Sequence, residues 1–91
     1  MKQLSEAEIE RELAETPGWE HVEDAIVRTV KFKDFKEAME FVNRVAEVAE
    51  EVNHHPDIAI RWDTVVLTQS THAAGGLTEH DFDLARRLNT L

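Results

Sequence analysis

The first apolar stripe predicts a helix close to the beginning of the sequence. The segment Ser5–Glu8 has the form of a capping box, in which the Ser5 hydroxyl accepts a hydrogen bond from the backbone N–H three residues later. Leu4 and Ile9 occupy the positions that form a hydrophobic staple around such a cap, and Leu13 continues the stripe. Pro17-Gly18 ends this helix, because proline lacks the N–H donor and glycine frees the backbone.

The next segment, from Trp19 to Phe32, has the alternation of apolar and polar residues that is typical of strands. We predict two short strands joined by a turn near Glu23-Asp24. In the second strand Ile26, Val30 and Phe32 share one face, and Arg28 interrupts that face.

A long apolar stripe with a helical period begins at Phe35, behind a cap of the D-x-x-E type at residues 34–37. The helix must stop near His54-His55-Pro56, because the residue before a proline is driven out of the α region. The apolar arc covers roughly half of the helix circumference, more than one sheet requires. The surplus predicts a homo-oligomer contact along four side chains of this helix: Phe41, Val45, Val48 and Val52.

The region after Pro56 is typical of a β-hairpin, because Ile58, Ile60 and Trp62 alternate with shorter or polar residues. A two-residue turn at Asp63-Thr64 would pair Trp62 with Val65 and Ile60 with Leu67, with all four on one face. Trp62 is therefore expected in the core, and the alternative is that its ring forms a flat wall of a pocket.

Gly75-Gly76 marks a loop, and Thr78 caps a last helix that carries Phe82 and Leu88. The order of elements is helix, two strands, helix, two strands, helix. This order predicts the α+β class, with a four-stranded antiparallel sheet and three helices packed on one face.

Composition narrows the functions that this chain can have. Its length of 91 residues predicts one domain over residues 1–91, and an apolar fraction of 42% excludes a disordered acidic tail. A net charge of −9 disfavours nucleic acid and anionic membrane surfaces as partners. There is no cysteine, no apolar run long enough to span a bilayer and no visible signal peptide, so we expect a cytoplasmic protein.

Histidine is the most unusual component, with five residues in the sequence. His54 and His55 follow the last turn of the long helix, and His72 lies beyond the last strand. Because an antiparallel hairpin can return the chain to the end of that helix, three imidazoles could face one cleft and transfer protons near neutral pH. The alternative is that the pair only ends the helix and that His72 is a surface residue. His21 and His80 are expected to be solvated and to have no role.

Two carboxylates accompany these histidines. Glu50 precedes His54 by four residues, so both lie on one face of a helix, where Glu50 either orients the imidazole or forms an ordinary surface pair. Asp81 is the third residue after Thr78 and is expected to complete a capping box, with a second role as a site carboxylate.

Other catalytic chemistries find less support. Glu50, His54 and His72 could supply ligands to a catalytic zinc ion, but the chain has no H-E-x-x-H motif and the adjacent His54 and His55 point to different sides of the backbone. Ser70 and Thr71 lack the glycines of a nucleophile elbow. No metal site is therefore expected.

The array Glu50-x3-His54-His55-Pro56-x5-Trp62-x9-His72-x8-Asp81 resembles the motif of the pterin-4a-carbinolamine dehydratases. The resemblance extends from about Gly18 to Leu88, and segments such as Ser70-Thr71-His72 add to it. Seven spaced positions in so short a chain make this resemblance specific.

The resemblance implies a four-stranded antiparallel sheet with three helices on one side, and dimers or tetramers, with a contact of the long helix in the tetrameric members. It implies dehydration of 4a-hydroxytetrahydropterin to quinonoid dihydropterin in tetrahydropterin recycling, without a metal or an organic cofactor.

The same resemblance assigns roles to the site residues. His54 and His72 flank the reacting carbon as acid and base, and His55 mainly holds the pterin. Glu50 orients His54, Asp81 positions the site from the helix N-terminus, and Trp62 packs the pocket wall.

Two positions depart from the pattern of this family, and two other functions stay open. Ile58 replaces an aromatic residue that several relatives carry, and Asn53 replaces an acidic residue. The first alternative is a non-catalytic dimerisation or interaction module, which the wide apolar arc of the long helix favours. The second is a metal-dependent hydrolase.

Overall fold

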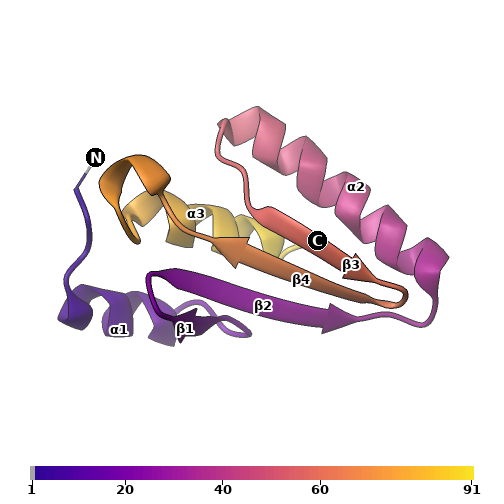
Figure 1. Cartoon of the computed structure of the whole chain (residues 1–91), viewed down its shortest axis with the longest axis horizontal. Helices are drawn as coiled ribbons and strands as arrows, with labels where there is room; N and C mark the ends of the chain where they lie inside the picture. The colour runs from indigo at the N-terminus through magenta and orange to yellow at the C-terminus, as the bar shows by residue number, and fades with distance from the viewer. Residues whose placement is uncertain (1) are drawn as a thin grey trace.

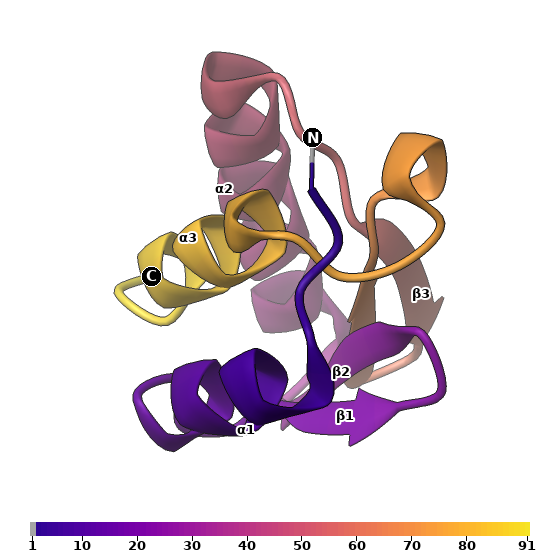
Figure 2. The ribbon, with the colours of Figure 1, turned by 90° about the vertical axis from the view of Figure 1, so that its left-hand side faces the viewer.

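The computed structural model describes residues 2–91, which form a sheet with helices on one side (Figures 1 and 2). The sheet has four strands in the order β1-β2-β4-β3, and all neighbouring strands are antiparallel. The predicted fold class is therefore confirmed. The elements follow the chain as α1 (Glu6–Ala14), β1 (Glu20–Val22), β2 (Ala25–Lys31), α2 (Phe35–Val52), β3 (Asp57–Arg61), β4 (Thr64–Gln69), the 3-10 helix η1 (His72–Ala74) and α3 (Glu79–Leu88).

The predicted caps begin the helices. The backbone N–H of Ser5 donates to the Glu8 carboxylate at 2.8 Å, which is half of the capping box of α1. Asp34 accepts from the backbone N–H of Glu37 at 2.9 Å and begins α2. Because these interactions lie within four residues of sequence, the local sequence is enough to predict them.

The β3–β4 hairpin differs from its predicted register. Its turn residues are Trp62 and Asp63, so Arg61 pairs with Thr64 and Ile60 pairs with Val65. The predicted pairing of Trp62 with Val65 is therefore wrong. Trp62 has a φ of +55°, the left-handed conformation that a tight two-residue turn requires and that a bulky residue rarely adopts.

The core lies between the sheet and the three helices, and Ile26, Leu67 and Phe82 are completely buried in it. Trp19 is the tryptophan of this core, and its Nε1 donates to the Asn89 side chain at 3.0 Å. Trp62 is 68% exposed, so its predicted place in the core is wrong. It lies in the turn, beyond the paired part of the strand.

The wide apolar arc of α2 is used mostly within the chain. Phe41 and Val45 are buried against the sheet, Val48 is half-buried, and Val52 is 37% exposed. Phe41 and Val45 are therefore unavailable for the predicted contact between copies, because they already pack in the core. In the part of the chain that the structure covers, none of the helices has both the length and the apolarity that a membrane crossing needs.

Candidate active site

The end of α2 sets the positions of the adjacent histidines. Asn53 follows the helix with a φ of +53°, and this left-handed residue turns the chain out of the helical repeat before Pro56. The backbone N–H of His54 still donates to the carbonyl of Ala49 at 3.2 Å, so the turn is held against the last helical residues. The His54 side chain is 17% exposed and that of His55 is 53% exposed, so the two rings have different surroundings.

A buried carboxylate holds the His54 ring. The Nε2 atom of His54 lies 2.7 Å from Oδ1 of Asp81, whose side chain has no exposed surface. Oδ2 of Asp81 accepts from the backbone N–H of Thr78 at 2.9 Å and from the Thr71 hydroxyl at 2.8 Å. When Nε2 carries the proton that it shares with Asp81, Nδ1 of His54 keeps a free lone pair. Asp81 therefore has two roles: it completes the expected cap of α3, and it orients the His54 ring.

The loop that carries His72 is fastened to the same carboxylate. The Thr71 hydroxyl contacts both Asp81 and the Thr78 hydroxyl, the latter at 2.9 Å. The Thr71 N–H also donates to the carbonyl of Gly76 at 3.0 Å, which closes the loop around η1. His72 is the first residue of η1 and is exposed. His72 therefore directly follows a residue, Thr71, that is hydrogen-bonded to Asp81. Within residues 2–91, no hydrogen bond joins the His72 ring to His54 or His55.

Glu50 pairs with a different histidine from the one predicted. Its Oε2 lies 2.5 Å from Nε2 of His55, and both side chains are largely exposed. The predicted pairing of Glu50 with His54 is wrong because Asn53 breaks the helical repeat, so residues four apart no longer share one face. The possible zinc site of Glu50, His54 and His72 lacks support for the same reason, because Glu50 and His54 do not lie on one face of a helix. Among residues 2–91 no group of three or more potential ligands is placed to hold a metal ion.

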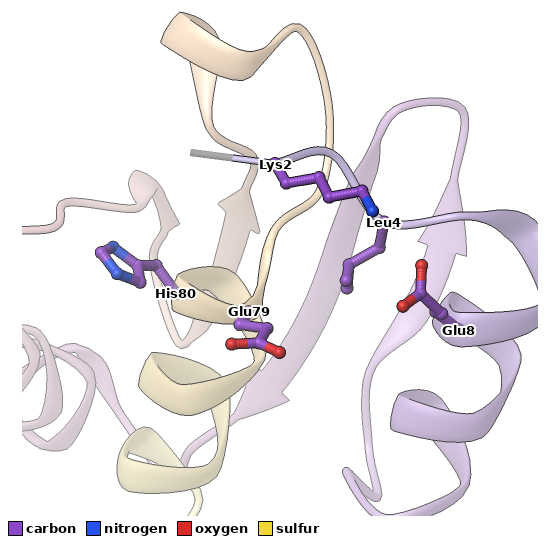
Figure 3. Close-up of a pocket in the computed structure, with 5 residues that line it drawn as sticks. All are labelled: Lys2, Leu4, Glu8, Glu79 and His80. Atoms are coloured by element: carbon purple, nitrogen blue, oxygen red, sulfur yellow. The ribbon is translucent and has the colours of Figure 1, made fainter.

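His80 belongs to the site although the sequence suggested no role for it. Its ring meets the ring of His54 edge to face, with 6.0 Å between the ring centres. Both rings line an open hollow of about 210 Å³ together with Val52 and residues of α3: Asp83, Leu84 and Arg87. A second hollow of about 220 Å³ lies on the other side of His80, between the first residues of the chain and α3 (Figure 3). The position of His80 directly before Asp81 was the only signal in the sequence.

Trp62 is the one predicted site residue that lies far from the histidines. It follows the last residue of β3, whereas His54 and His55 precede the first, and Figure 1 shows the β3–β4 turn at the opposite end of the strand from that loop. Five residues of extended strand, Asp57–Arg61, lie between Pro56 and Trp62, which places these two residues about 20 Å apart. Within one chain, Trp62 therefore does not form a wall of the histidine site.

The fold and the site define an α+β protein in which a histidine, held by a buried carboxylate, lines a hollow between the end of α2 and one side of α3. A family model described as pterin 4 alpha carbinolamine dehydratase matches residues 2–91. The chain belongs to this family.

Proteins of similar length match this chain in sequence over nearly the whole of both chains. A protein from Thermomicrobium roseum, named provisionally as a pterin-4-alpha-carbinolamine dehydratase, is 58% identical over 91 residues, which are 100% of this chain and 98% of the relative. A protein from Acidobacterium capsulatum with the same provisional name is 52% identical, and the match covers 100% of this chain and 99% of the relative.

Solved structures share the fold. The crystal structure of a transcriptional coactivator/pterin dehydratase from Brucella melitensis superposes with a TM-score of 0.93 at 37% identity, covering 98% of this chain and 97% of that one. A pterin dehydratase-like protein identified as a RuBisCO assembly factor in the alpha-carboxysome matches with a TM-score of 0.64 at 19% identity, over 79% of this chain and 83% of its own. The second likeness shows the fold alone.

Proposed function

We propose that this chain dehydrates a 4a-hydroxytetrahydropterin to the quinonoid dihydropterin, with His54, His55 and His72 as its acid, base and binding groups. The observation that carries the proposal is the buried Asp81, which contacts both the His54 ring and the hydroxyl of Thr71, the residue directly before His72. Membership of the dehydratase family supports a pterin as the substrate class.

The reaction requires two proton transfers at adjacent atoms of the pterin. The bond between C4a and its hydroxyl oxygen breaks, and the oxygen takes up a proton and leaves as water. The N5–H bond gives up its proton, and the remaining electron pair forms the C4a=N5 double bond. The pterin is neither oxidised nor reduced. Histidine is suited to both transfers, because imidazole changes its protonation state near neutral pH.

In this proposal His54 and His72 lie on either side of the reacting carbon, and His55 holds the pterin. Asp81 is a positioning residue, because it fixes the plane of the His54 ring and the proton on Nε2 while Nδ1 stays available. Glu50 positions His55 in the same way, but from an exposed place on α2. Either His54 or His72 can protonate the hydroxyl, according to the face of the pterin that carries it.

The test is a direct measurement of carbinolamine dehydration by the purified chain. We expect His54→Ala and His72→Ala to lower kcat at least about a hundredfold, the usual contribution of one acid or base group. His21→Ala is the matched control, since His21 lies in β1 at the opposite edge of the sheet from β3, and it should keep the original rate. The proposal fails if the unaltered chain does not accelerate dehydration, or if both site variants keep its rate.

The two alternative functions lose the features that suggested them. The interaction module rested on the wide apolar arc of α2, and Phe41 and Val45 of that arc are buried within the chain. The metal-dependent hydrolase rested on Glu50 next to His54, and Glu50 instead contacts His55. The proposed dehydratase function gives a role to both histidine–carboxylate pairs, His54 with Asp81 and His55 with Glu50.

A further inference from the structure

Two neighbouring residues of α3 contact the His54 ring from two directions. Oδ1 of Asp81 lies 2.7 Å from Nε2, at one edge of the ring. The His80 ring meets the same ring with 6.0 Å between the ring centres, and the two planes are almost perpendicular, at 81°. Consecutive residues of a helix point about 100° apart, so a single turn can hold one ring at two places. The first turn of α3 therefore restrains His54 through both Asp81 and His80.

The two contacts differ in their surroundings. Asp81 is completely buried and is itself held by Thr71 and Thr78. His80 is exposed and does not belong to the buried core. A substitution of His80 should therefore leave the fold intact, whereas a substitution of Asp81 also removes part of the cap of α3. The packing of the core does not account for the contact between His80 and His54.

The open hollow beside His54 offers its ring an alternative position. The lining of this hollow of about 210 Å³ includes both imidazoles and the apolar side chains of Val52 and Leu84. A neutral imidazole is small enough to enter it, and apolar walls do not oppose its entry. A rotation about the side-chain bonds of His54 would carry the ring there, because side chains exchange between staggered rotamers. In that position Nε2 no longer contacts Asp81, and Nδ1 points in a different direction.

His80 lies between this hollow and the second one. It lines both of them, and Figure 3 shows its ring extending from the first turn of α3 away from Leu4 and Glu8. The ring therefore occupies space into which His54 would otherwise rotate. An edge-to-face contact between aromatic rings at this separation is also favourable in itself. His80 thus stabilises the position of His54 on Asp81 and obstructs the alternative one.

We propose that His80 is a positioning residue that keeps the His54 ring on Asp81 and out of the hollow. The inference rests on the proposed dehydratase function, because there the direction of Nδ1 decides how well His54 transfers a proton. His80 acts through the shape of its ring and not through its nitrogen atoms, since the two side chains meet as rings. A phenyl ring at position 80 should therefore serve as well as the imidazole.

Steady-state kinetics of carbinolamine dehydration with three variants test this role. We expect His80→Ala to lower kcat about threefold to about tenfold, the range that follows from the loss of one aromatic contact, while KM changes less than about twofold. His80→Phe should retain at least about half of the original kcat. Glu79→Gln, at an exposed neighbour in the same turn of α3, is the matched control and should keep the original kcat. An alanine variant with the original kcat, or a phenylalanine variant as slow as the alanine one, would overturn the proposal.

Nitrogen-15 NMR of the full chain tests the same role without the reaction. Above about pH 8, where an ordinary imidazole is neutral, the nitrogen shifts of His54 report which ring nitrogen carries the proton. The unaltered chain and His80→Phe should both carry it on Nε2, the state that Asp81 favours. In His80→Ala the two nitrogen shifts should move toward each other, because the ring leaves Asp81 for part of the time and both tautomers are then populated.

Unchanged His54 shifts in the alanine variant would overturn the positioning role. If the shifts change as expected but the unaltered chain dehydrates no pterin, the proposed function fails and the positioning of His54 by His80 stands.

Discussion

The Nε2 atom of His54 lies 2.7 Å from Oδ1 of Asp81, although the two residues are 27 positions apart in the sequence. This contact joins the end of α2 to the beginning of α3. Asp81 also accepts hydrogen bonds from Thr71 and Thr78, so a single buried carboxylate fixes a histidine ring, a helix terminus and the loop that carries His72. Stability and activity should therefore depend on the same residue.

Asp81→Asn should impair both properties. An amide can accept hydrogen bonds at only one of its two ends, so one of the three donors around Asp81 loses its acceptor in a buried place. We expect a loss of about 1–3 kcal/mol in the free energy of unfolding and a fall in kcat of at least about tenfold. Thr71→Val removes one donor and leaves the His54 contact in place, so it should lower the stability while kcat falls less than in Asp81→Asn. Urea unfolding and the dehydration rate measure the two effects, and an Asn variant with unchanged kcat would exclude the positioning role.

Glu50→Gln should behave differently from Asp81→Asn. The contact between Glu50 and His55 is largely exposed, so its loss should cost less than about 1 kcal/mol in unfolding free energy. Because His55 is proposed to hold the pterin, we expect KM to rise while kcat stays nearly constant. Glu47→Gln, on an exposed part of the same helix, is the control. A fall in kcat without a rise in KM would place His55 in the chemical step instead.

Trp62→Asn should stabilise the single chain. The left-handed conformation of Trp62 costs roughly 1–2 kcal/mol for an ordinary residue, and asparagine adopts it more readily. We expect the asparagine variant to have a higher Tm than the unaltered chain. A lower Tm would mean that the Trp62 ring stabilises its own chain.

Acid should weaken the first helix through Glu8. The backbone N–H and then the hydroxyl of Ser5 donate to the Glu8 carboxylate and hold its pKa below its usual range. A carboxyl group whose pKa is lowered by folding stabilises the fold above its unfolded pKa, and this contribution disappears as the pH falls through the folded pKa. The unaltered chain should therefore lose more stability on acidification than Glu8→Gln. Thermal unfolding between about pH 2 and about pH 6 measures this, and equal losses would contradict it.

The sequence predicts what is decided locally. The caps at Ser5 and Asp34 act within four residues, and the helical period of α2 is visible in the apolar positions themselves, so the order of elements follows from the sequence. Arg28 interrupted the strand pattern because its side chain reaches Asn89 at the end of α3, at 3.0 Å. A contact over 61 positions leaves no local signal.

The predictions were wrong at two places where one backbone dihedral angle decides which residues meet. Trp62 adopts a left-handed turn that its residue type disfavours, and the hairpin register moved by two residues as a result. Asn53 also has a positive φ, and because of this turn Glu50 contacts His55 instead of His54. The motif identified Asp81 and the three histidines as candidates, but only the packing of α2 against α3 brings His80 to His54.

The pH dependence of kcat/KM for carbinolamine dehydration tests imidazole acid/base catalysis most directly, since this parameter reports the acid and the base of the free enzyme. After subtraction of the uncatalysed rate, we expect activity to fall on both sides of a maximum between about pH 5 and about pH 8. A profile that stays flat over this range and one pH unit beyond it would contradict catalysis by His54 and His72.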